Sequence, residues 1–340
     1  MCEDDGTGRT AHADAAKGRG VCLFSGGLDS QLAVCVLREQ GVYVEGVVFE
    51  SPFFRIAGAQ RGAANLNLTL HVVPFTADIL ELVQHPRHGF GGALNPCIDC
   101  HARMIRRAGE WMGQHGFDFV ATGEVLNQRP MSQTRRSLAT VEQDAALNGR
   151  LLRPLSALLL EPTLPETLGL VDRNRLLGLS GRSRKPQVEL AARYGLKEYP
   201  APAGGCLLTE KGFCRKLADL KNREGLDDER LVRILTVGRH FRLPGSAKCV
   251  MGRDARENAL LQRIAEPGDL WLHTVDIPGP TVLIPRGADT SDRMTAAALC
   301  AAYGDHQGRS LVTVRIHAAG GAEDQRVAPM ERARGAAWLC

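Results

Sequence analysis

The chain has few aromatic residues and no long apolar run. Phe, Trp and Tyr make up 5% of its 340 residues, too few for a surface with many base-stacking rings. No stretch approaches the roughly 18 consecutive apolar residues of a membrane helix. The N-terminal segment begins with acidic residues and lacks the apolar core of a signal peptide. We therefore expect a cytoplasmic protein with no membrane partner.

Positive and negative side chains are also nearly balanced in number. Lys and Arg number 42 against 38 Asp and Glu, a net charge of +4. This balance permits a nucleic-acid partner without requiring one, because local clustering matters more than net charge. With 44% hydrophobic and 24% charged residues, the composition is that of a globular protein, and the length predicts two domains.

Alternating strands and helices characterise the first half of the chain. A parallel sheet is predicted because short apolar runs alternate with segments of helical spacing. The predicted strands are 21–25, 42–50, 68–75 and 117–123, and the predicted helices include 29–40, 76–84 and 97–115. This pattern indicates an α/β fold with a doubly wound parallel sheet, whose ligands bind at the carboxyl edge.

The pattern changes after the Pro/Gly-rich stretch near residue 200, where shorter β-rich segments predict a second, smaller α+β domain. Residues 126–150 are polar and Arg-rich, and we interpret them as a flexible or RNA-facing loop. The predicted divisions are a disordered leader 1–18, a nucleotide-binding domain 19–210, a helical linker 211–235, a second domain 236–317 and a flexible tail 318–340.

The segment SGGLDS, residues 25–30, joins the first predicted strand to the first helix. Two glycines allow a tight turn, and the amides at a helix N-terminus can bind phosphate. The chain lacks the G-x-x-x-x-G-K-[ST] motif of P-loop NTPases, and this loop is not G-x-G-x-x-G. A carboxylate beside phosphates is reasonable only with an intervening cation. A plain strand–helix turn is the structural alternative.

The SGGLDS segment resembles the pyrophosphate-loop (PP-loop) signature of the ATP pyrophosphatase superfamily. The resemblance implies an adenine nucleotide alpha-hydrolase-like, HUP-type fold. It further implies an enzyme that cleaves ATP between the α and β phosphates and adenylates a carbonyl oxygen of its substrate. It also implies that Ser25, Gly26, Gly27 and Ser30 bind the pyrophosphate, and that Asp29 helps to hold Mg²⁺.

Three of the ten cysteines form a second candidate site. Cys97 and Cys100 stand in NPCIDC, and Cys206 follows two glycines in AGGCLLT. A thioredoxin-type pair should follow the first strand, and zinc would need a fourth ligand, for which His101 is adjacent. Three cysteines with one open position suit a [4Fe–4S] cluster. Unrelated cysteines remain the alternative.

The PP-loop followed by P-C-x-x-C and G-G-C resembles the tRNA thiouridine synthases over roughly residues 20–210. In cluster-dependent members three such cysteines bind [4Fe–4S], whose free iron carries sulfide. In cluster-free members one CxxC cysteine and the late cysteine act as a persulfide and disulfide pair. The resemblance implies catalytic roles for Asp29, Cys97 and Cys206. Two further features near this site are Glu124 after a strand and the basic run Arg182, Arg184 and Lys185.

The segment 250–284 resembles the RNA-binding domain of NFACT proteins. The matching residues are Gly252, Arg253, Asn258, Asp269, Trp271, His273, Pro278 and Gly279. Because Trp271 and His273 alternate with leucines on one predicted strand, both can face one side of a sheet. A core role for Trp271 is the structural alternative.

Together these features predict an ATP-dependent tRNA uridine sulfurtransferase that uses ATP, Mg²⁺ and a [4Fe–4S] cluster. The expected partners are tRNA and a sulfur donor, either a cysteine desulfurase or free sulfide. A homodimer is compatible with the sequence but not predicted by it. The rival hypotheses are another PP-loop ligase or sulfur-transfer enzyme, and a non-catalytic RNA-binding factor related to ribosome quality control.

Overall fold

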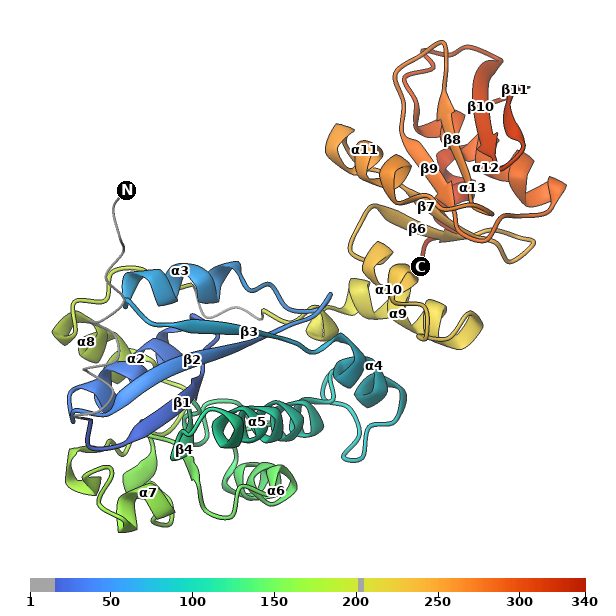
Figure 1. Cartoon of the computed structure of the whole chain (residues 1–340). Helices are drawn as coiled ribbons and strands as arrows, with labels where there is room; N and C mark the ends of the chain where they lie inside the picture. Colours follow the sequence, from blue (N-terminus) through green and yellow to red (C-terminus); the bar gives the residue numbers. More distant parts are fainter. Residues whose placement is uncertain (1–15, 201–204) are drawn as a thin grey trace, which may run out of the picture. The chain divides into compact units, whose positions relative to one another are not determined.

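The computed structural model describes residues 16–200 and 205–340, which divide into two compact units, Met1–Thr209 and Glu210–Cys340 (Figure 1). Most of the leader predicted for residues 1–18 lies outside the described residues. The helices predicted as a linker over 211–235 are grouped with the second unit.

The first unit is built on a five-stranded parallel sheet in the order β3-β2-β1-β4-β5. Its strands are β1 (Arg19–Leu23), β2 (Tyr43–Glu50), β3 (Leu70–Pro74), β4 (Phe119–Thr122) and β5 (Leu151–Leu152). The predicted parallel α/β sheet is confirmed. The order reverses on either side of β1, so the loops after β1 and β4 meet at the carboxyl edge, where ligands of such sheets bind.

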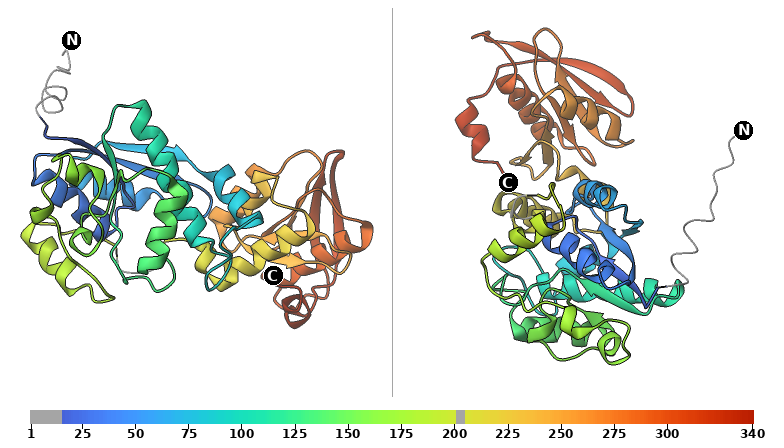
Figure 2. Two further views of the ribbon diagram at one scale, coloured as in Figure 1. Left: turned by 90° about the horizontal axis from the view of Figure 1, so that it is seen from below. Right: turned by 90° about the vertical axis from the view of Figure 1, so that its left-hand side faces the viewer.

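Helices cover both faces of this sheet (Figures 1 and 2). The helices of the first unit are α2 (Leu28–Arg38), α3 (Ala57–Asn65), α4 (Thr76–Gln84), α5 (Cys97–Gln114), α6 (Arg135–Ala145), α7 (Leu164–Thr167) and α8 (Lys185–Arg193), with 3₁₀ turns at Ala157–Leu159, Arg173–Arg175 and Leu207–Thr209. The α2 side chains pack against β1, β2 and α8, whereas α5 packs against β1, β4 and α6. The buried faces of α2, α3 and α8 share one core with β1, β2 and β4.

Residues 126–150, which we interpreted from the sequence as a flexible or RNA-facing loop, do not form a loop throughout. Helix α6 occupies Arg135–Ala145, and the Thr134 side chain caps it by accepting a hydrogen bond from the Ser137 N–H. The sequence pattern concealed this helix because it begins with two arginines and its buried residues, among them Leu138 and Val141, are few and separated by mostly polar residues.

The second unit contains a six-stranded antiparallel sheet in the order β11-β10-β8-β9-β7-β6. Its strands are β6 (Arg239–Arg242), β7 (Lys248–Met251), β8 (Leu270–Thr274), β9 (Thr281–Ile284), β10 (Val312–Ala318) and β11 (Gly321–Val327). Its helices are α9 (Lys211–Arg223), α10 (Glu229–Ile234), α11 (Ala255–Ile264), α12 (Thr290–Tyr303) and α13 (Arg332–Ala336). Helix α12 packs on one face and forms the core with β8, β9 and β10.

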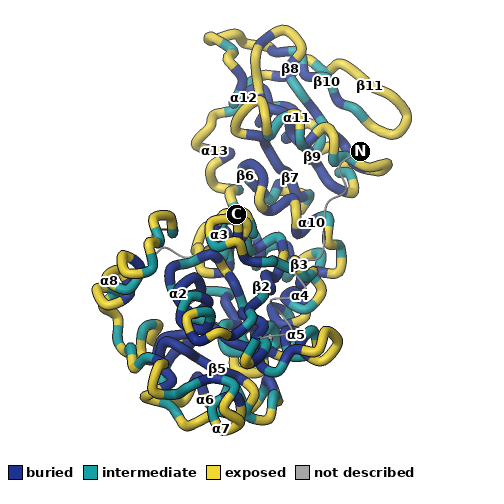
Figure 3. The backbone as a smooth tube through the Cα atoms, turned by 60° about the vertical axis from the view of Figure 1, so that its left-hand side comes forward, coloured by how far each residue is buried: buried dark blue, intermediate teal, exposed yellow. Residues whose placement is uncertain are grey.

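The segment 318–340 is structured, contrary to the flexible tail predicted. Strand β11 pairs along β10 from Val312–Val327 to Ala318–Gly321, and α13 follows it. The exposed polar residues of β11, coloured yellow in Figure 3, explain the error, because only Val327 of this strand is buried. In the part of the chain that the structure describes, no helix combines the length and apolar character required to span a bilayer.

Candidate functional site

The glycine loop lies between β1 and α2, as predicted. Gly26 has φ +74°, a left-handed conformation that suits glycine. A Cβ added to Gly26 would stand 2.2 Å from the carbonyl oxygen of Gly58 in α3. Both observations require glycine at position 26. The close packing of α3 fixes the loop against the sheet.

The first turn of α2 presents N–H donors toward the loop. The initial N–H groups of a helix have no intrahelical acceptor, and Gly27, the N-cap residue, has no side chain to satisfy them. Ser30 Oγ donates to the Gly27 carbonyl oxygen over 2.9 Å and lies 3.3 Å from Ser25 Oγ. These amides and hydroxyls form a donor set for an anion at the positive end of the helix.

Asp29 is held by a relay of two amide side chains. Gln128 Nε2 donates to Asp29 Oδ2 over 2.7 Å, and Gln187 Nε2 donates to Gln128 Oε1 over 3.0 Å. The other carboxylate oxygen, Oδ1, is buried without a hydrogen-bond partner among the described residues. Such an orphaned oxygen is costly unless a ligand or cation satisfies it. The position and chemistry of Oδ1 therefore fit a divalent cation.

Two arginines lie near this carboxylate. Burial raises the pKa of Asp29, while the Gln128 hydrogen bond and the charges of Arg184 and Arg129 oppose that rise. Arg184 belongs to the basic run that the sequence singled out, and Arg129 follows Gln128 directly. The loop around residues 181–185 therefore brings positive charge to the PP-loop edge, where phosphates would lie.

The three predicted cysteines gather near one another. Cys97 begins α5, Cys100 is buried one turn later, and Cys206 forms an isolated antiparallel bridge with Phe54, in the segment that follows β2. Burial raises the pKa of the Cys100 thiol well above its ordinary value, and Cys206 and Cys97 add to that shift. Within residues 16–200 and 205–340, no three His, Cys, Asp or Glu side chains are arranged to hold a metal ion.

A buried ionic network connects the cysteine helix to the PP-loop. Glu124 accepts from Arg153 Nε over 2.9 Å through Oε2, and its Oε1 lies 3.0 Å from His101 Nδ1. Burial acts to raise the pKa of Glu124, but Arg153 and His101 outweigh it and hold this pKa at about 2. The sequence indicated Glu124 but not His101 or Arg153 as partners, because no motif marks them.

Gly123 brings this network against the nucleotide loop. A Cβ at Gly123 would lie 2.6 Å from the backbone nitrogen of Ser30 and from the carbonyl carbon of Asp29. The carboxyl end of β4 therefore touches the first turn of α2, and the next residue, Glu124, reaches the helix that carries Cys97 and Cys100. The cysteines and the PP-loop belong to one edge of one sheet.

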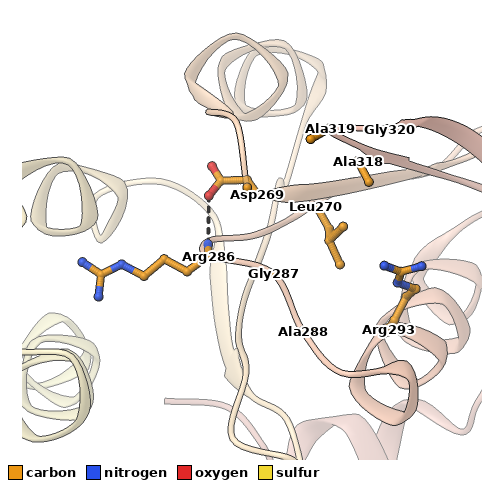
Figure 4. Close-up of a pocket in the computed structure, with 10 residues that line it drawn as sticks. Asp269, Leu270, Arg286, Gly287, Ala288, Arg293, Ala318, Ala319 and Gly320 are labelled. Atoms are coloured by element: carbon orange, nitrogen blue, oxygen red, sulfur yellow. Dashed lines mark hydrogen bonds between the residues drawn. The ribbon is translucent and has the colours of Figure 1, made fainter.

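In the second unit, Asp269 of the D-L-W-L-H segment has a structural role. It accepts from both terminal nitrogens of Arg230, at 2.6 and 3.2 Å, and from the backbone N–H groups of Glu266 and Arg286. Figure 4 shows it beside the Arg286 backbone, at a pocket that Arg293 and the residues around Ala318 also line. Its carboxylate oxygens are occupied by these bonds, so Asp269 fixes the chain ahead of Trp271 and His273.

The fold and the site define a parallel α/β domain with a glycine loop at the carboxyl edge of its sheet, followed in the chain by a separate antiparallel domain. Residues 15–159 match the family model described as thiamine biosynthesis protein (ThiI), and residues 238–339 match that of the NFACT protein RNA binding domain. These two matches agree with the two sequence resemblances, to a PP-loop domain in the first part of the chain and to an NFACT-type domain in the second.

Curated relatives match part of the chain. A probable tRNA sulfurtransferase of Acholeplasma laidlawii is 33% identical over 153 residues, covering 41% of this chain and 34% of the relative. The tRNA-specific 2-thiouridylase MnmA of Marinobacter nauticus is 29% identical over 141 residues, covering 37% and 36%. This chain thus spans about a third of the length of these relatives. A solved 4-thiouridine synthetase–RNA complex with bound ATP gives a TM-score of 0.39 at 22% identity, covering 64% of this chain and 52% of that one.

Proposed function

We propose that the chain is an ATP-dependent tRNA uridine sulfurtransferase. The observation that carries this proposal is the single edge shared by the glycine loop and the cysteines, joined through Gly123, Glu124 and His101. The ThiI-family match of residues 15–159 and the sulfurtransferases among the relatives support it.

The first step of the proposed reaction is adenylation. A uridine carbonyl is a poor electrophile, so its oxygen attacks the α-phosphate of ATP and expels pyrophosphate. The α2 amides, Ser25, Ser30 and the nearby Arg129 and Arg184 would stabilise the charge that develops on the leaving group. Mg²⁺, held with the help of Asp29, would neutralise phosphate charge.

The second step replaces the adenylated oxygen by sulfur and releases AMP. Cys97, Cys100 and Cys206 would deliver the sulfur, supplied by a cysteine desulfurase or by free sulfide. Their all-thiol chemistry is that of a [4Fe–4S] site, which when bound by three thiolates would keep one iron open to an exogenous ligand. Because the three described thiols are not arranged as a closed metal site, binding of the cluster would have to draw them together. The target uridine must be unpaired or flipped out to reach this edge.

The proposal is tested by incubating the chain with an unmodified tRNA transcript, ATP, Mg²⁺ and sulfide under anaerobic conditions. We expect thiolated uridine on nucleoside mass spectrometry, with AMP and pyrophosphate released in step. A chain that cleaves ATP with a different acceptor and forms no thionucleoside would refute the proposal. The second unit is proposed to hold the tRNA.

A further inference from the structure

The second unit has an open sheet face beside its helix-covered core. Along β8 and β10 the side chains alternate, so that Leu272 and Ile316 are buried against α12 while Trp271, His273 and His317 point to the opposite face. These three residues, which we name the ring column, are each only partly buried.

Helix α11 covers only part of that opposite face. It packs on β9, where Gln262 Nε2 donates to Thr281 Oγ1 over 3.1 Å and all four strand residues are buried. The next strands, β8 and β10, bury alternate residues only, and the outer strand β11 is exposed along most of its length (Figure 3). Among the described residues, α11 packs mainly on β9, so the ring column on β8 and β10 stands beside this helix.

The rings of the column are nearly parallel. The indole of Trp271 and the imidazole of His317, paired across the strands, lie with centroids 3.6 Å apart and planes inclined by 3°. His273 lies 5.3 Å from each of them, inclined by 18° and 21°. A core tryptophan would pack among aliphatic side chains, whereas this one is stacked at the surface.

Both histidines of the column favour the neutral state. Burial lowers the pKa of His273, and Arg315 adds to the effect. Burial likewise lowers the pKa of His317, with His273 and Arg315 contributing, while Asp324 opposes both shifts. Arg315 itself is engaged by Asp324 at 2.7 Å. At neutral pH the column is an uncharged aromatic surface, suited to a flat π-system more than to a phosphate.

The column has space on its β11 side. The residue paired with His317 on β11 is Ala322, which is exposed and carries only a methyl group. Arg326, exposed on the same strand, is paired in register with Thr313 and faces the same side as Ala322. A flat ring placed over Ala322 would extend the stack. Arg326 lies on the same face about 13 Å further along the strand, beyond the ion-paired Asp324, where it could contact the backbone of a neighbouring nucleotide.

We propose that the ring column is a stacking site for an unpaired RNA base, so that the second unit recognises single-stranded rather than duplex RNA. The proposal rests on the proposed function, in which this unit holds tRNA, and specifies how it does so. A base inside a duplex has both faces covered by its neighbours, so only an unpaired base can add to the column.

The test measures binding of fluorescein-labelled 12-nucleotide RNA, single-stranded or annealed to its complement, to the full chain without ATP. We expect the wild type to prefer the single strand. His317→Ala should weaken single-strand binding about five-fold or more, the effect of losing one stacking contact. His317→Phe, which keeps a flat ring, should restore most of it.

A second readout uses the tryptophan itself. Binding of the unlabelled single strand should quench intrinsic fluorescence, and Trp271→Phe should abolish that quenching while largely retaining affinity. The matched control is His115→Ala, which removes a histidine stacked 3.8 Å from Trp111 in the first unit and should leave both signals unchanged. Circular dichroism and thermal melting verify that each variant is folded.

Equal binding by wild type and folded His317→Ala, quenching that survives in Trp271→Phe, or a preference for the duplex would each overturn the stacking site. The proposed function fails separately, if the wild type binds single-stranded RNA through the column but forms no thionucleoside. Conversely, thiolation that persists together with column-independent RNA binding would refute the site alone.

Discussion

Nδ1 of His101 lies 3.0 Å from Oε1 of Glu124, a contact between the helix that carries two of the cysteines and the end of β4. Because a carboxylate whose pKa is held at about 2 only accepts hydrogen bonds at neutral pH, His101 must donate through Nδ1. One buried acid thus fixes the helix bearing Cys97 and Cys100 relative to the glycine loop.

Asp29→Ala should abolish ATP-dependent pyrophosphate release while leaving the fold intact. The carboxylate has one oxygen held by Gln128 and one without a partner in the described chain, as expected of a residue that meets a cation. Pyrophosphate release measured with a coupled assay checks this, with Asp227→Ala, an exposed aspartate of the second unit, as the control. Normal ATP turnover in Asp29→Ala would contradict the assignment of residues 25–30 as the loop that binds the phosphates of ATP.

Gln187→Leu should raise the Mg²⁺ concentration needed for half-maximal ATP binding by about ten-fold, the usual effect of losing a residue that orients a metal ligand. Gln187 is buried and orients Gln128, which orients Asp29. Isothermal titration of ATP at several Mg²⁺ concentrations measures the change. Gln143→Leu, at an exposed position of α6, is the control, and an unaltered Mg²⁺ requirement in Gln187→Leu would argue against the relay.

Glu124→Gln should lower the free energy of unfolding at pH 7 by about 3 kcal/mol, because it removes the buried one of the two carboxylates that pair with the buried Arg153 guanidinium and leaves only the partly exposed Glu142. Urea denaturation measures the difference. Glu110→Gln, which removes a surface pair with Arg107, should cost about 0.5 kcal/mol or less.

The difference in unfolding free energy between the wild type and Glu124→Gln should depend on pH in a defined way. The pKa of Glu124 is lowered in the folded state from its ordinary 4.5 to about 2. Its ionised form therefore stabilises the fold fully above about pH 4.5, and that stabilisation is lost as the pH falls toward 2. The stability gap between wild type and Glu124→Gln should be constant from pH 7 to 5 and narrow below 4.5. A gap that stays the same at pH 3 would contradict the ionic role.

If the three cysteines hold the proposed [4Fe–4S] cluster, replacing Cys97, Cys100 or Cys206 singly by alanine should remove together the brown colour expected of the anaerobically purified protein and the thionucleoside. Cys35→Ala, in the same unit, and Cys214→Ala, in the second, should lose neither. Iron content, the absorbance spectrum and nucleoside analysis provide the measurements. Iron-free protein that still thiolates tRNA would reassign the cysteines to a persulfide carrier and its resolving partner.

The sequence by itself determined the class of the first unit and the position of its loop. A strand ending in S-G-G-x-D-S before an amphipathic helix allows few structures, because Gly26 needs a positive φ and the helix must bury its apolar side. The spacing of Cys97 and Cys100 likewise placed them one turn apart on a helix. These features depend on neighbours in the chain, which periodicity and residue type report directly.

Tertiary structure alone decided which distant residues complete the site. Gln187 reaches Gln128 across 59 positions, and Arg153 reaches Glu124 across 29. The role of Trp271 was likewise decided by tertiary structure, because the pairing of β10 with β8 brings His317 against its indole ring at the surface. No local pattern encodes such pairs, because a buried polar side chain is satisfied by whichever partner the packing of the sheet and helices brings within hydrogen-bond distance.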